Sequence, residues 1–226
     1  MSNAMVLDWN EISDLLQSID VYEPMKEAFI EYSQGHAEIP PVGELLFVDP
    51  PGEVHIKYGY IKGGSHYVVK IASGFADNRD HNVEPGQGMM ILFDIKTGVP
   101  RAVLIDDANL TDLRTGIAGA IASKTMANVG VETASIIGTG VQARHQARCL
   151  LDVMPIKEIC CWGRNAVRLD ELVQDLSDLD VSITACSDLR ELTQRSQLVV
   201  TTTSAKEPII DVEWVQPGTH ITAVGS

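Results

Sequence analysis

The spacing of apolar residues divides the chain into two parts. In the first part, two segments carry apolar residues at helical spacing, and others carry them in strand-length runs. The expected helices span residues 8–16 and 21–32, with Asp8 and Asp20 as N-caps. The expected strands span residues 44–48, 54–61, 67–72, 89–94 and 102–105, separated by turns rich in Pro and Gly. The first part therefore predicts two helices and a mainly antiparallel sheet.

From residue 108 onward, helical segments alternate with strand-length apolar runs. The expected helices span residues 111–126, 142–154, 166–176 and 189–194, and the expected strands 134–137, 158–162, 181–184, 198–202 and 220–224. Small residues in the first of these helices, including Gly116 and Gly119, allow close packing. The alternation predicts an α/β fold with a Rossmann-type, doubly wound parallel sheet. We expect an N-terminal α+β domain over residues 5–115 and a Rossmann domain over residues 116–226.

Composition and charge restrict the classes of function. Thirty-one acidic and 17 basic residues give a formal net charge of −14, which is unfavourable for binding nucleic acid or an anionic membrane. No apolar run approaches the roughly 20 residues of a membrane-spanning helix, and no signal peptide is visible, so we expect a soluble, cytoplasmic protein. The four cysteines lack metal-ligand spacing, so we expect reduced core thiols and no metal site.

A dinucleotide fingerprint follows the strand expected at residues 134–137. The sequence Gly138-Thr139-Gly140-Val141-Gln142-Ala143 has the form Gly-x-Gly-x-x-Ala and leads into an amphipathic segment. In this motif the first glycine permits a tight turn, the second lets the backbone approach a pyrophosphate, and the alanine lets the helix pack closely. The helix N-terminus then faces the phosphates. The alternative is an ordinary glycine-rich β–α turn, which the surrounding β–α alternation disfavours.

The residues after the next strand bear on the choice of nucleotide. A domain that prefers NAD normally carries Asp or Glu there, about 20 residues beyond the glycines, to bind the ribose 2′-hydroxyl. Here the strand ends Trp162-Gly163-Arg164-Asn165, without a carboxylate. We expect Arg164 to bind a 2′-phosphate, and Trp162 or Arg164 to lie near the adenine; the alternative is an arginine in solvent. The sequence thus predicts NADP(H) over NAD(H).

Three basic residues are candidates for binding substrate. Lys70 is either a lysine on a solvated strand face or an ammonium in a cleft that binds a carboxylate or donates to a carbonyl oxygen. Arg114 is expected in the first turn of a helix capped by Thr111. A cation there opposes the helix dipole, so either an anion occupies the site or the arginine extends into solvent. The sequence around Lys57 shows no decisive pattern, and the favoured interpretation is a charged side chain on the face of a strand.

Several motifs together resemble the ornithine cyclodeaminase/μ-crystallin family in order and spacing. They are Lys-Ile-Ala-Ser-Gly-Phe (70–75), Leu-Thr-Asp-Leu-Arg-Thr-Gly-Ile-Ala-Gly-Ala (110–120), Ile-Ile-Gly-Thr-Gly-Val-Gln-Ala-Arg (136–144), Val-Val-Thr-Thr-Thr-Ser (199–204) and Pro-Gly-Thr-His-Ile-Thr-Ala-Val-Gly-Ser (217–226). The resemblance covers essentially the whole chain. It implies an NAD(P)-dependent enzyme that oxidises a small amino acid to an imine with deamination, or reduces an imine or keto acid. The alternative is a μ-crystallin-like NADP(H)-binding protein with little turnover.

The resemblance also implies roles for individual residues. Lys70 and Arg114 would hold the substrate carboxylate beside the nicotinamide, with Arg114 also near the cofactor. The remaining implied cofactor-binding residues are Gly138, Thr139, Gly140, Val141, Gln142, Thr202, Thr203, Val224, Gly225 and Ser226. Homodimers would form through the substrate domain, which the N-terminal segment builds together with a return of the chain at its C-terminus.

Two features depart from the cyclodeaminases of this family. Those enzymes carry a carboxylate-binding arginine where this chain has Pro41-Val42-Gly43-Glu44, and an acidic residue, suited to the distal amine of ornithine, near the position of Lys57. A lysine there repels that amine. Both departures weaken ornithine as the substrate and leave a reductase or dehydrogenase of a small imino or keto acid as the alternative.

The end of the chain leads to a further expectation. The family's catalytic aspartate, which exchanges a proton with the reacting amine, follows the Gly-Ser of Ala-Val-Gly-Ser, and this sequence ends at Ser226. A parallel sheet that stops there leaves its last strand uncovered. We therefore expect a fragment of a longer enzyme, with an incomplete Rossmann domain, that keeps much of the nucleotide site but has negligible turnover.

Overall fold

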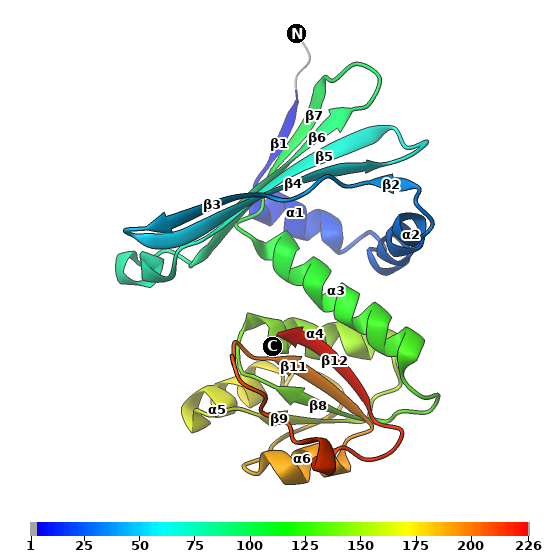
Figure 1. Ribbon diagram of the computed structural model, residues 1–226, viewed down its shortest axis with the longest axis vertical. Helices are drawn as coiled ribbons and strands as arrows, with labels where there is room; N and C mark the ends of the chain where they lie inside the picture. The colour runs from blue at the N-terminus through cyan, green and yellow to red at the C-terminus, as the bar shows by residue number, and fades with distance from the viewer. Residues whose placement is uncertain (1–3, 226) are drawn as a thin grey trace. The chain divides into compact units, whose positions relative to one another are not determined.

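The computed structural model describes residues 4–225, which form two compact units. The units divide after Thr111. Helix α3 (Asn109–Met126) contains both this division and the boundary predicted after residue 115 (Figure 1). None of the described helices combines the length and apolar character that crossing a membrane requires.

The first unit is built around a mixed sheet. Its described strands are β1 (Met5–Leu7), β2 (Ala37–Glu38), β3 (Gly43–Val48), β4 (Pro51–Ile61), β5 (His66–Gly74), β6 (Gly86–Asp94) and β7 (Pro100–Ile105). They pair in the order β1-β7-β6-β5-β4-β2, and β3 also pairs with β4. The pair β1–β7 is parallel, and the other pairs are antiparallel. Helices α1 (Trp9–Leu16) and α2 (Tyr22–Ser33) and the 3-10 helix η1 (Ala76–His81) complete the unit.

The predicted helices and strands of this unit are confirmed, with ends that shift by a few residues. Asp8 caps α1 as predicted, because its carboxylate accepts from the Glu11 N–H at 3.0 Å while Glu11 accepts from the Asp8 N–H at 3.1 Å. Asp20 accepts from the Tyr22 N–H at 2.8 Å at the start of α2. The sequence reasoning missed β1 and β2, which have three and two residues.

The two faces of the first sheet differ in their cover. Figure 1 shows α1 and α2 on the same side of the sheet. On the strands β4 to β7, one face is mostly apolar or aromatic, with Ser73 and Gln87 near one end; its apolar and aromatic side chains include Tyr58, Tyr60, Tyr67, Val69, Met89, Ile91, Phe93, Val103 and Ile105. Tyr58, Met89 and Ile105 are 37–43% exposed, and Ile12 is the one fully buried apolar residue among those described in this unit. This apolar face therefore lacks cover within the unit.

The second unit is the predicted doubly wound α/β domain. Its described strands are β8 (Thr133–Ile137), β9 (Glu158–Trp162), β10 (Ser182–Ala185), β11 (Leu198–Thr202) and β12 (His220–Gly225). They alternate with α4 (Val141–Val153), α5 (Ala166–Asp175), α6 (Leu189–Arg195) and the 3-10 helix η2 (Val212–Trp214). All strand pairs are parallel, in the order β10-β9-β8-β11-β12. This is the Rossmann order, which reverses between β8 and β11.

Both faces of this parallel sheet are buried, which explains why its strands were readily predicted. Ile136 packs with Leu150 of α4 in one apolar cluster, and Ile137 packs with Leu192 of α6 in another. Strands buried on both faces need apolar residues at successive positions rather than at alternate ones. The continuous apolar runs of the sequence are the result.

Helix α3 packs closely on α4 through its glycines, as the small residues predicted. A Cβ atom at Gly116 would lie 2.9 Å from Cys149 Sγ and 3.0 Å from His145 Cβ, and one at Gly119 would overlap the Gln146 side chain. Gln146 is fully buried and donates from Nε2 to the Thr115 carbonyl at 2.9 Å. The contact therefore leaves no room for larger residues at these two positions.

The start of α3 differs from the prediction. The helix begins at Asn109, and Thr111 is not its cap. Instead, the Asp106 carboxylate accepts from the Leu110 N–H at 3.0 Å. Arg114 consequently lies in the second turn rather than the first, so the prediction of a first-turn cation is wrong and the helix dipole opposes its charge less.

Candidate functional site

The glycine-rich turn joins β8 to α4 at the carboxyl edge of the parallel sheet. Gly138 has a φ of 125°, and a Cβ atom there would overlap the Thr202 side chain at the end of β11. The Gly138 N–H donates to the Trp162 carbonyl of β9 at 2.9 Å, and the Thr202 hydroxyl donates to the Ile137 carbonyl at 3.2 Å. Gly138 therefore joins the turn to both neighbouring strands, and the fold itself requires a glycine here.

Gly140 has no comparable role in the fold. It precedes α4 with φ −81° and ψ −173°, a conformation that any residue adopts. A Cβ atom at this position would meet nothing within 4 Å. The open space fits a ligand that approaches the backbone closely, as a dinucleotide pyrophosphate does in this motif.

Helix α4 has no side-chain cap, and neither has α2 at its N-cap Val21, whereas three other helices have one. Asp8 caps α1, Asn165 caps α5 and Asp188 caps α6, each by accepting a backbone N–H. Gly140 offers no side chain to α4, and the first turn of α4 contains no acidic residue. Its first N–H groups are therefore open to a ligand, and the helix dipole favours negative charge at this end.

The side chains next to the turn are held by neighbours in the second unit. Gln142 donates from Nε2 to Asp112 Oδ1 at 3.0 Å. Arg144 donates from Nη1 to the Thr139 carbonyl at 2.8 Å and pairs with Asp175 at 2.7 Å through Nε. Both side chains are thus engaged by other groups, and in the described structure neither accepts from the first N–H groups of α4.

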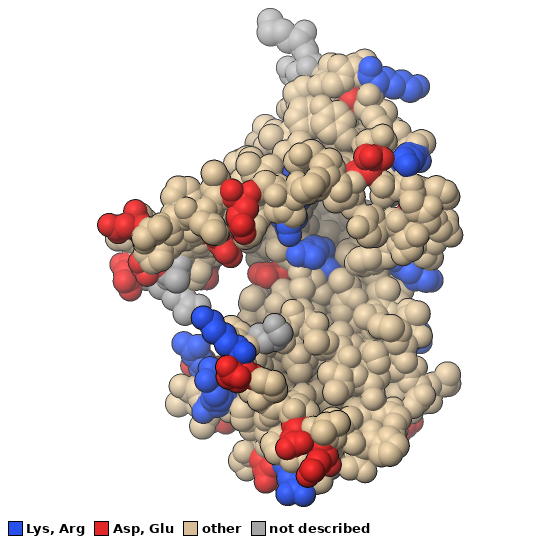
Figure 2. All heavy atoms as spheres, in the orientation of Figure 1, with Lys and Arg blue, Asp and Glu red and all other residues tan. Residues whose placement is uncertain are grey.

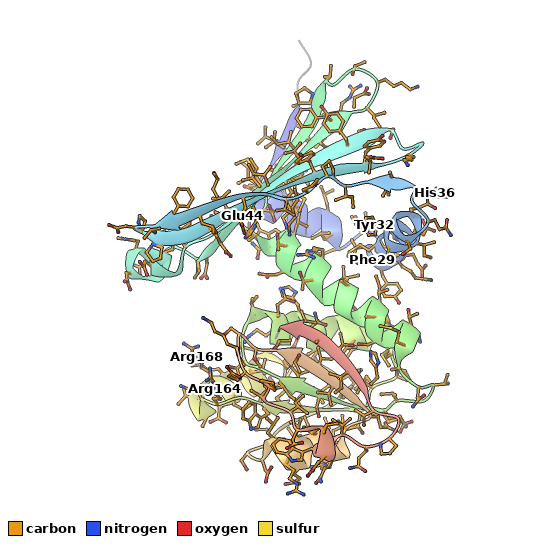
Figure 3. All side chains as sticks on the ribbon, viewed as in Figure 1. Phe29, Tyr32, His36, Glu44, Arg164 and Arg168 are labelled. Carbon is orange, nitrogen blue, oxygen red and sulfur yellow. The ribbon has the colours of Figure 1, made fainter. Side chains whose placement is uncertain are left out.

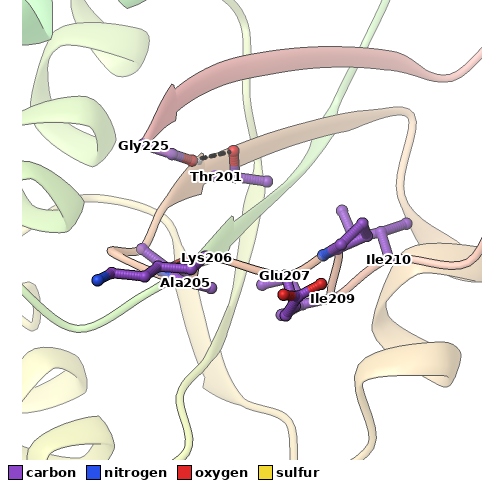
Figure 4. Close-up of a pocket in the computed structure, with 9 residues that line it drawn as sticks. Thr201, Ala205, Lys206, Glu207, Ile209, Ile210 and Gly225 are labelled. Atoms are coloured by element: carbon purple, nitrogen blue, oxygen red, sulfur yellow. Dashed lines mark hydrogen bonds between the residues drawn. The ribbon is translucent and has the colours of Figure 1, made fainter.

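The ends of β11 and β12 form a second part of the site. Thr201 donates from its hydroxyl to the Gly225 carbonyl at 2.9 Å (Figure 4). A pocket of about 560 Å³ opens beside this bond; its lining includes Thr203, Lys206, Glu207, Ile209 and Ile210. Of the predicted cofactor residues, Thr203 and Gly225 line this pocket. Val224 is half-buried, and Ser226 lies outside the described residues.

The sheet order brings these predicted residues together. Strands β8 and β11 are neighbours in the sheet, and the direction of the strand order reverses between them. Open α/β sheets bind ligands in the crevice outside the carboxyl ends of the strands at such a switch point. The glycine turn, Thr202, Thr203 and Gly225 all stand at this edge, whereas Arg164 follows β9, the next strand along.

Two arginines stand at the turn from β9 to α5. Arg164 and Arg168 are both exposed and extend from this turn (Figure 3), and Figure 2 shows basic side chains gathered on this edge of the unit. Neither guanidinium pairs with a carboxylate among residues 4–225. The sequence reasoning identified Arg164 but missed Arg168, whose signal was its position four residues later in the first turn of α5.

Lys70 lies in the middle of the first unit's sheet. Its direct partners are Lys57 on β4 and Met90 on β6, so the three side chains share one face. All three line a groove of about 610 Å³. Lys70 is half-buried and Lys57 is exposed. The alternative interpretation of Lys70, as a lysine on a solvated strand face, is therefore less favoured than a role in the groove.

Asp106, which the sequence reasoning missed, is buried near Lys70. Its side chain is 1% exposed, and Oδ1 has no hydrogen-bond partner among the described residues. Burial raises the pKa of this carboxyl group, while the Leu110 N–H and the Lys70 ammonium act in the opposite direction. Asp107 and Ala108 follow with φ of 47° and 65°. A buried carboxylate beside a strained turn is typical of functional sites.

The second predicted substrate ligand, Arg114, is exposed on α3. It belongs to the second unit and Lys70 to the first. Their joint action on a carboxylate therefore stays a prediction.

The cysteines take no part in these sites. All four are free thiols, and Cys149, Cys160 and Cys161 are buried as predicted, while Cys186 is half-buried. Burial raises the pKa of Cys149 to about 11 and that of Cys161 to about 12, which keeps both thiols protonated and unreactive. Within residues 4–225, no group of three His, Cys, Asp or Glu side chains is arranged to hold a metal ion.

Comparison with known proteins finds relatives over the whole chain. Residues 2–226 match the Ornithine cyclodeaminase/mu-crystallin family. An uncharacterized cyclodeaminase of Sinorhizobium fredii is 35% identical, over 100% of this chain and 69% of its own length. The chain covers 62–69% of the lengths of the first three curated relatives.

Solved structures share the fold. The Δ1-pyrroline-2-carboxylate reductase of Thermococcus litoralis, in complex with NADH and L-proline, is 28% identical with a TM-score of 0.87, covering 98% of this chain and 68% of that one. An archaeal alanine dehydrogenase dimer with bound NAD is 30% identical with a TM-score of 0.85, covering 96% and 66%. The Rossmann-type α/β class predicted from the sequence is confirmed.

Replacing Gly140 with alanine should weaken nucleotide binding and leave the fold intact. The added methyl group meets nothing in the chain but obstructs a pyrophosphate at the start of α4, so we expect the Kd to rise by about tenfold or more. Isothermal titration with NADPH and NADH measures the loss, and thermal unfolding should give an unchanged melting temperature. Gly138→Ala is the contrasting variant and should lower the melting temperature, because of its φ and its overlap with Thr202. Wild-type affinity in Gly140→Ala would show that the turn does not bind the pyrophosphate.

Proposed function

This chain belongs to the ornithine cyclodeaminase/mu-crystallin family, and we propose that it acts in an NAD(P)-dependent interconversion of a small amino acid with its imine or keto acid. The observation that carries the proposal is the uncapped N-terminus of α4 behind Gly140, at the switch point of a parallel sheet. The reductase with NADH and L-proline and the alanine dehydrogenase with NAD support it.

We assign nucleotide binding to the second unit and most of the substrate site to the first. When bound, the nicotinamide supplies the hydride chemistry, and the protein supplies binding and orientation. In this assignment the backbone of residues 138–142 holds the pyrophosphate. Thr202, Thr203, Val224 and Gly225 contact the cofactor from the ends of β11 and β12. Lys70 and Arg114 bind the substrate carboxylate, and Arg114 also lies near the cofactor.

The proposed preference against ornithine follows from the positive charge of Lys57. Because this ammonium lines the same groove as Lys70, it repels a substrate with a distal amine such as ornithine. We therefore propose reduction of a small imino or keto acid, or the reverse oxidation of an amino acid, in place of ornithine cyclisation.

The preferred nucleotide is proposed to be NADP(H). Arg164 and Arg168 are two cations without carboxylate partners in the described structure, and no acidic residue stands at the tip of β9 to accept a ribose 2′-hydroxyl. A 2′-phosphate supplies the dianion that such an arginine pair suits.

Lys70→Met should weaken substrate binding and spare the nucleotide site, whereas Arg114→Met should weaken both, because Arg114 also lies near the cofactor. Loss of one charged partner from a dehydrated carboxylate site costs about 2–5 kcal/mol, so the affinity for the substrate should fall by about thirtyfold or more. Calorimetric titration of the NADP⁺-saturated protein with pyrroline-2-carboxylate and with pyruvate measures the loss, with ornithine as the comparison.

Titration of Lys70→Met with NADPH is the control, and its nucleotide affinity should stay within a few-fold of wild type. A variant with normal substrate affinity would remove that residue from the substrate site. Tight nucleotide binding by a wild-type chain that binds none of these compounds would instead favour a mu-crystallin-like binding protein.

Wild-type protein should bind NADPH more tightly than NADH, and Arg164→Ala should lose most of this preference. A charge-assisted contact to a phosphate at an exposed site is worth roughly tenfold in affinity. Dissociation constants for both nucleotides in both proteins measure it. Arg190→Ala, which removes an exposed arginine from α6, is the matched control and should bind like wild type. Equal wild-type affinities, or unchanged NADPH binding in Arg164→Ala, would contradict the NADP(H) assignment.

A homodimer should form through the apolar face of the first sheet. This face runs across β4 to β7 without cover inside its own unit, and an apolar surface of this kind favours association. Light scattering after size exclusion should give twice the 24.6 kDa chain mass. Met89→Glu places a charge on this face and should yield monomers, whereas Leu46→Glu places it on the other face and should not. A wild-type monomer, or a Met89→Glu dimer, would rule out this interface.

A further inference from the structure

We propose that the groove beside Lys70 recognises a substrate with a second anionic group, and that Lys57 is the ligand of that group. The inference rests on the proposed function, because it takes Lys70 as a ligand of the substrate's first carboxylate. The predicted class is therefore amino, imino or keto dicarboxylic acids with a short carbon chain.

The first support is the register of the sheet. Lys57 on β4 and Lys70 on β5 are direct partners in an antiparallel pair. Side chains in this position leave the same face with Cβ atoms about 4.5–5.5 Å apart, and like charges placed there destabilise the pair. Both lysines also line the same groove of about 610 Å³. An anionic ligand with two charged groups explains why both cations face one space.

The second support is the charge balance of the groove. Asp106 interacts with Lys70 and offsets part of its charge. Lys57 has no carboxylate partner within residues 4–225, and the described lining of the groove contains no acidic residue. The whole chain has 31 acidic and 17 basic residues, so a groove with two lysines and no acid is opposite in sign to the average surface.

Acidic side chains on the same sheet face are engaged elsewhere. Glu44 and Glu53 contact the His55 ring at 3.7 Å and 3.5 Å. His66, which lines the groove, is bonded through Nδ1 to the Ser65 hydroxyl at 2.8 Å. The positive charge of Lys57 is therefore left for a ligand.

The remaining lining suits a short carbon chain between two anionic groups. Apolar side chains from α2 and three strands contribute, including Ala28, Ile61, Val68 and Met90. Adjacent strands lie about 4.8 Å apart, so two anionic groups a few bonds apart reach both lysines. A substrate with a cationic side chain meets repulsion at the same place.

The test compares two keto acids that differ only in the second carboxylate. Wild-type protein saturated with NADP⁺ is titrated calorimetrically with 2-oxoglutarate and with 2-oxopentanoate. We expect 2-oxoglutarate to bind about tenfold more tightly, the scale of one well-placed but exposed ion pair. Lys57→Met should bring the ratio of the two affinities close to one, and Lys57→Arg should retain the preference. Lys96→Met removes an exposed lysine outside the groove and should behave as wild type.

The outcomes separate this inference from the proposed function. Equal affinities of the wild type for the two keto acids, or an unchanged affinity ratio in Lys57→Met, would overturn the second anionic subsite. In that case, 2-oxopentanoate binding that is lost in Lys70→Met would still support the proposed function. Binding of neither keto acid by the wild type would overturn both. Because Lys57 is exposed, its variants should fold, and the two wild-type titrations decide the question without any variant.

Discussion

The second unit is arranged around a set of backbone N–H groups at the start of α4 that no side chain caps. Gly138 brings this turn against Thr202 and Trp162, and the neighbouring Gln142 and Arg144 side chains are held by other partners. What remains at the helix end is backbone with a positive dipole and no acid, an arrangement that stabilises an anion bound there. The parallel sheet, the close α3–α4 contact and the glycines all serve to hold this end in place.

Sequence reasoning located most of the fold because the signals it used are local. Residues 136–137 and 198–200 are apolar at successive positions, as a sheet buried on both faces requires. Strands β1 and β2 escaped detection because three and two residues are too few to establish a period. Their pairing, including the parallel β1–β7 contact, depends on residues far apart in the sequence.

The candidate site residues likewise fall into those that a local motif reveals and those that depend on the whole fold. The fingerprint glycines and Arg164 are local motifs and were found from sequence alone. The pairing of Lys57 with Lys70 was not, because cross-strand register is fixed by the turns and cores of the whole sheet. Thr111 was wrongly assigned as a cap because two non-glycine residues, Asp107 and Ala108, take a left-handed conformation that their identity does not indicate.

The charge distribution links these sites. The chain is strongly acidic overall, yet a pair of cations stands at each of two places where an anionic ligand is expected: the groove of Lys57 and Lys70, and the turn that carries Arg164 and Arg168. At physiological ionic strength charges are screened beyond about 8 Å, so the net charge weakens only slightly what a lysine or arginine does at contact distance. The same net charge disfavours polyanions, which engage the surface over longer stretches. Anion recognition in this protein is therefore proposed to depend on a few donors at contact distance, each of which a single substitution removes.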